Sequence, residues 1–146
     1  MAKKVDIKLA ECIVRRGVKC GVGYAVRRNG DQEARVFYAT LRDSNPRALA
    51  GLRHVFEELM ETGRVLEIRR FRKIQDRIWE AKHSASGARV FCFKHDGVWW
   101  ATHGYIKDER KTPSAQIDRA LEIMQEHIDR FWGNEGKGRN DERSDV

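Results

Sequence analysis

"RIWEAKHSASGARVFCFKHDGVWWATHGYI", residues 77–106, contains three short apolar runs separated by turn residues. The runs cover about residues 77–83, 88–94 and 98–106, and they are rich in the β-branched and aromatic side chains that are typical of strands. Asp96-Gly97 lies between the last two runs and is a tight-hairpin signal, because both central residues of such a turn need a positive φ. This stretch therefore predicts three antiparallel strands.

An amphipathic helix is predicted on each side of these strands. The first helix follows Asn45, which can cap it, has Pro46 in its first turn and ends at Gly63. The second begins at Thr112, with Pro113 at its first position. Apolar residues recur at helical spacing in both: Leu49, Leu52, Phe56 and Leu59 in the first, and Ile117, Leu121, Met124, Ile128 and Phe131 in the second. The order predicts an α+β domain, an antiparallel sheet with helices packed on one face.

The N-terminal part of the chain is harder to interpret. Residues 22–41 read as two strands joined by the hairpin signal Asn29-Gly30. Residues 1–21 carry apolar side chains at helical spacing, which favours a short helix, but the alternation of Val5, Ile7 and Leu9 also fits a strand.

Composition limits the class of protein. The 146 residues fit one domain. No apolar run is long enough for a membrane span, and the charged N-terminus is a poor signal peptide. Three cysteines without CxxC spacing predict reduced thiols in the cytoplasm rather than a disulfide scaffold or a zinc site. With 29 Lys and Arg against 22 Asp and Glu, the net charge of +7 favours an anionic partner, most commonly nucleic acid.

Strand alternation sorts the candidate functional side chains by face. It places Trp99, Ala101, His103, Tyr105 and Lys107 together on the last strand, Arg89 with two phenylalanines on the middle strand, and Lys82 with Glu80 on the first. If these faces coincide, cations for phosphates and rings for bases gather near the charged junction that follows Ile106. Each residue also has an ordinary structural explanation, as core packing or a solvated surface.

Metal-free RNA cleavage needs a group that takes the 2′-hydroxyl proton, one that stabilises the extra negative charge on phosphorus, and one that protonates the leaving 5′-oxygen. Lysine, arginine, histidine and tyrosine can supply all three. The sequence contains no P-loop, GxGxxG, HExxH or GxSxG motif.

Three stretches of the chain occur in an order that resembles a known family: "LRHVFEELMETG" (52–63), "FRKIQDRIWEAKHSASGARVFCFKHDG" (71–97) and "HGYIKDERKTPSAQIDRAL" (103–121). From about Ala34 onward the chain resembles the RelE/HigB toxin superfamily, and its phage-derived HigB-like branch most closely. The resemblance implies a RelE-like domain (31–132) and leaves an N-terminal extension (1–30) outside it. The tail (133–146) has one apolar residue and is expected to be disordered.

The resemblance implies the toxin of a toxin–antitoxin system, an endoribonuclease that cuts mRNA with or without the ribosome and needs no cofactor or metal. It also implies a partner antitoxin with a helix-turn-helix. Carried over to this sequence, Arg89 and Lys82 hold the scissile phosphate, Lys107 or Tyr105 transfers a proton, and His103 is a weaker catalytic candidate. The predicted RNA-backbone contacts are Arg69, Arg70, Arg72, Lys73 and Lys111.

Departures from the family pattern keep other functions open. Lys82 stands where the family has Arg, and Asp108 and Glu109 place negative charge beside the predicted site. The N-terminal extension has no counterpart in the pattern: it covers a sheet edge, occupies the place of the antitoxin, or binds something else. A catalytically inert RelE-like protein that binds a host protein or nucleic-acid machine is the main alternative, and a plain basic nucleic-acid-binding module is the third.

Overall fold

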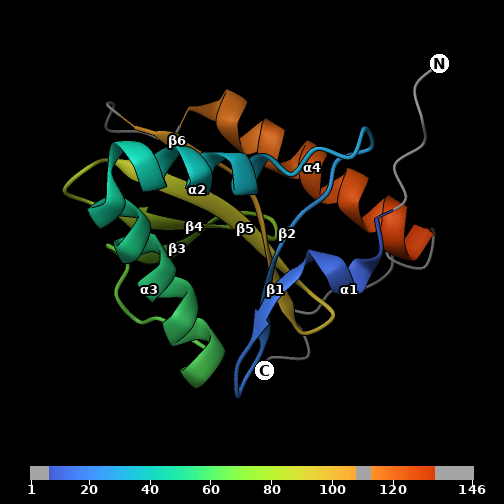
Figure 1. Ribbon diagram of the computed structural model, residues 1–146, viewed down its shortest axis with the longest axis horizontal. Helices are drawn as coiled ribbons and strands as arrows, with labels where there is room; N and C mark the ends of the chain where they lie inside the picture. Colours follow the sequence, from blue (N-terminus) through green and yellow to red (C-terminus); the bar gives the residue numbers. More distant parts are fainter. Residues whose placement is uncertain (1–6, 108–112, 134–146) are drawn as a thin grey trace.

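A computed structural model describes residues 7–107 and 113–133 of the chain (Figure 1). Within these ranges the elements run in the order α1 (Leu9–Cys12), β1 (Ile13–Arg16), β2 (Gly21–Tyr24), α2 (Glu33–Ser44), α3 (Pro46–Thr62), β3 (Phe71–Gln75), β4 (Ile78–His83), β5 (Ala88–His95), β6 (Val98–Ile106) and α4 (Ser114–Trp132). The predicted α+β class is confirmed.

The sheet has six strands in the order β1-β2-β6-β5-β4-β3. Strands β4, β5 and β6 are the three predicted from residues 77–106, and they pair antiparallel. Asp96 and Gly97 both have positive φ in the turn between β5 and β6, as the hairpin signal predicted. The prediction of a wholly antiparallel sheet is wrong in one place, because β2 pairs parallel to β6.

Helices cover both faces of the sheet, whereas the sequence predicted one (Figure 1). On one face α2 and α3 bury Leu41, Leu52 and Leu59 against apolar side chains of the sheet. On the opposite face α4 buries Ile123 and Ile128. Strands whose two faces both meet helices must be apolar on both, which is why residues 90–93 and 98–101 are continuously buried.

Helix α2 replaces a predicted strand. The residues after Asn29-Gly30 are aromatic and β-branched and were expected to form the second strand of a hairpin. In the structure Ala34, Tyr38 and Leu41 are buried at a spacing of four and three residues, while Val36 is 65% exposed. The segment therefore forms a helix, because its apolar residues can be buried on one helical face although their types favour a strand.

The ends of α3 follow its sequence signals. The Asn45 side chain accepts a hydrogen bond from the Ala48 N–H at 3.1 Å, Pro46 is the first helical residue, and Gly63 ends the helix with φ +86°. Helix α4 begins at Ser114, with Pro113 as its capping residue rather than its first helical residue. Thr112, Asp108, Glu109 and residues 134–146 of the predicted tail lie outside the described residues.

The N-terminal extension is part of the sheet. Residues 9–16 form one helical turn and then strand β1, so both patterns seen in the sequence are present in succession. Strand β2 lies between β1 and β6, which adds two strands to the edge of β6. Of the three roles left open for this segment, covering a sheet edge is the one that the structure describes.

Gly23 on β2 provides a test of how closely the N-terminal segment packs against β6. A Cβ atom on Gly23 would lie 2.6 Å from both the Cys12 carbonyl oxygen and the Trp100 ring. We expect Gly23→Ala to lower the free energy of unfolding by about 3 kcal/mol, since neither neighbour can retreat easily. Urea denaturation measures the loss.

Gly97→Ala is the control for Gly23→Ala. Gly97 has φ +77° but open space around it, so that substitution isolates backbone strain of about 1 kcal/mol. Equal losses in the two variants would contradict close packing at Gly23.

No helix among the described residues is both long and apolar enough to cross a membrane.

Candidate active site

A β-bulge in β6 decides which side chains meet. Phe91 pairs with His103 and Cys92 with Ala101, so Thr102 is an extra residue on β6. Trp99 and Ala101 therefore pack on the α2/α3 face, whereas Tyr105 packs on the α4 face. The prediction that Trp99, Ala101, His103 and Tyr105 share one face is wrong, because the bulge reverses the alternation beyond Thr102.

The bulge brings three of the predicted catalytic residues into one row across the sheet. Lys82 on β4 pairs directly with Arg89 on β5, and Arg89 pairs directly with Tyr105 on β6. Directly paired residues of antiparallel strands present their side chains on the same face. The Tyr105 ring also stacks on Phe91, with centroids 5.8 Å apart and planes inclined by 12°. The row therefore lies on the α4 face, next to the apolar core.

Glu80 is a further site residue, which strand alternation placed with Lys82 but to which the sequence interpretation gave no role. Its side chain is fully buried, and its Oε1 lies 3.4 Å from Arg72 Nε and 3.5 Å from Arg89 Nη1. The Arg89 side chain is only 11% exposed, and its buried Nε and Nη1 atoms donate no hydrogen bond within the described part of the chain. Glu80 thus holds the Arg89 guanidinium in a largely buried position. The signal for this role was the spacing of two residues between Glu80 and Lys82, which places both side chains on one face of β4.

Burial and nearby positive charges both change the pKa of Lys82. Partial burial lowers the pKa of the Lys82 ammonium, and the positive charges of Arg89, Arg72 and Lys107 lower that pKa further. Lys107 is itself buried, and its backbone N–H donates to the Gly87 carbonyl at 2.8 Å. The charges of Arg89 and Lys107 therefore both act on the Lys82 ammonium. Among the described residues no group of three or more His, Cys, Asp or Glu side chains could hold a metal ion.

His103 occupies the row next to these residues but is held inside the fold. Its side chain is buried, its Nε2 lies 2.9 Å from Gln116 Oε1 on α4, and its Nδ1 lies 3.2 Å from Thr102 Oγ1. Burial lowers the pKa of His103 to about 4, so the ring is neutral at pH 7. These contacts tie β6 to α4 and favour a structural role.

The predicted RNA-backbone residues are dispersed. Arg72 lies on the α4 face beside Glu80, and Lys73 lines a hollow on the opposite face with Trp79 and Trp99. Arg70 is held by Glu58 at 2.9 Å and by Glu67 at 3.2 Å, and Arg69 is exposed. Lys111 lies outside the described residues. Of this set, the structure places Arg72 with the Lys82–Arg89–Tyr105 row.

Two buried histidines predict a stability loss in mild acid. Burial lowers the pKa of His127 to about 3 and of His103 to about 4, from an ordinary 6.5. A lowered folded-state pKa means that the unfolded chain binds the protons first, so stability is complete above pH 6.5 and falls as the pH approaches 4. We expect a loss of about 2–4 kcal/mol between pH 7 and 5, measured by urea unfolding.

His127→Asn tests the source of this pH dependence. His127 Nδ1 accepts the Val26 N–H at 2.9 Å, and the Asn side-chain oxygen can replace this acceptor without titrating. The pH slope of the unfolding free energy is expected to fall to roughly half. The exposed His54→Gln is the matched control. A slope as steep in His127→Asn as in His54→Gln would contradict the prediction.

Comparison with known proteins places the chain in a family. The family model described as "Phage derived protein Gp49-like (DUF891)" matches residues 39–125, which is more than half of the chain and includes Lys82, Arg89 and Tyr105. A search of curated proteins finds no match. The chain therefore belongs to the phage-derived Gp49-like family, a RelE/HigB-like family that is related to the toxins of toxin–antitoxin systems.

Proposed function

We propose that this protein is the toxin of a toxin–antitoxin pair, a metal-independent endoribonuclease that cuts mRNA, and that it belongs to the HigB-like branch. The observation that carries the proposal is the row Lys82–Arg89–Tyr105 on one face of the sheet. Membership of a toxin-like family supports the same function.

The side chains of the row suit the three requirements of RNA cleavage. The planar Arg89 guanidinium carries N–H donors in a fork that suits the non-bridging oxygens of the scissile phosphate. Lys82 adds a second positive charge, and its lowered pKa lets it exchange a proton more readily than an isolated lysine. The unprotonated form of Lys82 accepts the 2′-hydroxyl proton as the 2′-oxygen attacks phosphorus. The bond from phosphorus to the 5′-oxygen breaks, and Tyr105 or Lys107 protonates that leaving oxygen, which gives a 2′,3′-cyclic phosphate and a 5′-hydroxyl. His103 has no proton-transfer role in this scheme.

Growth inhibition tests the proposal in cells. Expression of the protein alone is expected to stop growth, and co-expression of a small helix-turn-helix protein encoded beside it is expected to restore growth. Lys82→Met should also restore growth while the protein accumulates in folded form. Normal growth with folded wild-type protein would count against the toxin function.

The alternative, a catalytically inert protein that binds a host machine, is favoured by one feature. Glu80 places a carboxylate against Arg72 and Arg89 and so neutralises part of the cationic row. This alternative predicts that one host protein is captured in a stoichiometric complex and that RNA in a translating extract stays intact.

A further inference from the structure

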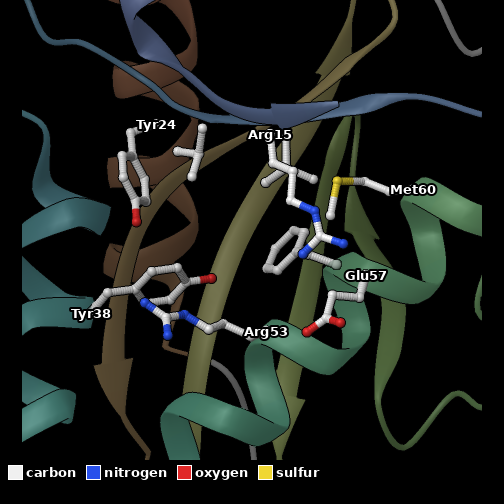
Figure 2. Close-up of a pocket in the computed structure, with 9 residues that line it drawn as sticks. Arg15, Tyr24, Tyr38, Arg53, Glu57 and Met60 are labelled. Atoms are coloured by element: carbon white, nitrogen blue, oxygen red, sulfur yellow. The ribbon is translucent and has the colours of Figure 1, made fainter. Parts of the chain in front are cut away.

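A cavity lies where the N-terminal strands meet helices α2 and α3 (Figure 2). Its volume is about 340 Å³, which is within the range of small-molecule sites. Five of its nine lining residues precede residue 39, where the match to the family model begins. The cavity is therefore built jointly by the N-terminal extension and the family domain, and it is separate from the Lys82–Arg89–Tyr105 row.

The cavity has an apolar floor and aromatic side walls. Phe56, Met60 and Val22 are buried beneath it. Tyr24 and Tyr38 meet edge to face along one side, with ring centroids 5.8 Å apart and planes inclined by 74°. Walls of this kind fit a flat apolar group. Burial raises the pKa of both tyrosines, so their hydroxyls remain protonated and able to donate hydrogen bonds.

Two arginines border the same cavity. In Figure 2 the Arg15 side chain descends from β1 toward Glu57, and Arg53 extends from α3 toward Tyr38. The positive charge of Arg53 acts on both tyrosines, which places its guanidinium near the aromatic wall. Neither arginine forms an ion pair in the described part of the chain, whereas Arg27, Arg70 and Arg119 all do. With Glu57 included, the mouth carries one net positive charge.

We propose that this cavity binds a small organic anion with a flat apolar body and a single negative charge. The body lies on the apolar floor beside Tyr24 and Tyr38, and the anionic group is held by Arg15 and Arg53. Guanidinium groups and tyrosine hydroxyls can all donate hydrogen bonds, so they suit the oxygens of a carboxylate or sulfonate. This site is independent of RNA cleavage, and either proposal can fail without the other.

A pair of fluorescent probes tests the charge requirement. 1-Anilinonaphthalene-8-sulfonate carries the sulfonate, and N-phenyl-1-naphthylamine has the same aromatic body without it. We expect the sulfonate to bind the full chain at one saturable site, at least tenfold more tightly than the uncharged probe. Arg15→Gln and Arg53→Gln should each weaken sulfonate binding about tenfold, as expected for one charge-assisted hydrogen bond, and leave the uncharged probe unaffected.

Two further variants make the test decisive. Arg42→Gln removes the same charge from an exposed position of α2 that does not line the cavity, and it should change neither affinity. Val14 is 57% exposed on the edge strand β1, so Val14→Trp can fill the mouth without disturbing the core and should block both probes. Equal affinity for the two probes, absence of saturable binding, or an effect of Arg15→Gln no larger than that of Arg42→Gln would overturn the proposal.

Discussion

Arg89→Met is expected to reduce the rate of RNA cleavage about 100- to 1,000-fold, the usual cost of removing one donor that stabilises transition-state charge. Arg89 lies at the centre of the cross-strand row, between Lys82 and Tyr105. Its neighbours cannot replace it, because neither presents a planar pair of donors to a phosphate. The measurement is the single-turnover cleavage rate of an mRNA in a translating extract.

Two variants separate this loss from a folding defect. Arg89→Lys keeps the charge that balances Glu80, so the fold is retained, but it loses the guanidinium fork and should recover only part of the rate. Arg42→Met removes one exposed positive charge from α2 and should leave the rate unchanged. If Arg42→Met slowed cleavage as much as Arg89→Met, general charge and not the row would be responsible.

Arg27→Met is expected to lower the free energy of unfolding by about 3 kcal/mol, because it leaves carboxylates without their charge partner in a partly buried setting. Arg27 binds Glu33 at 2.8 Å, Glu126 at 2.8 Å, and also Glu122. These contacts join the loop after β2 to α2 and α4, which lie on opposite faces of the sheet. Urea unfolding at pH 7 measures the loss.

The pH dependence of the Arg27 variant provides a second measurement. Hydrogen bonds from Arg27 lower the pKa of Glu126 to about 2, from an ordinary 4.5. A lowered carboxyl pKa stabilises the fold above pH 4.5, and this stabilisation is lost as the pH falls toward 2. The difference between wild type and Arg27→Met should therefore shrink below pH 4.5. The exposed Arg42→Met, which lies outside this network, is the control, with an expected change within about 0.5 kcal/mol.

The sequence predicted the elements whose signals are local. Strands β4 to β6 and helix α3 were predicted within one or two residues, because turn and capping residues define their ends. Strand β3 and the pairing of β2 with β6 were missed, since parallel pairing depends on contacts between residues 21–24 and 98–101 that no local pattern records. Helix α2 was mistaken for a strand because Val36 and Phe37 have strand propensity, although Val36 is exposed.

The sequence predicted which residues belong to the candidate site, but it did not predict how they are arranged across the sheet. Lys82 and Arg89 follow from strand alternation and hairpin register, so their shared face could be anticipated. Tyr105 joins them only because Thr102 is an extra residue in β6, and nothing in the sequence marks that bulge. His103 was proposed from its residue type, but its burial and its contact with Gln116 depend on the docking of α4.

The chemistry of the Lys82–Arg89–Tyr105 row can be tested most directly by mapping the ends of an mRNA after incubation with the protein in a translating extract. The proposed mechanism predicts new fragments with 2′,3′-cyclic phosphate and 5′-hydroxyl ends from the wild-type protein and none from Arg89→Met. Intact mRNA with folded wild-type protein, or the same fragments from both proteins, would contradict it.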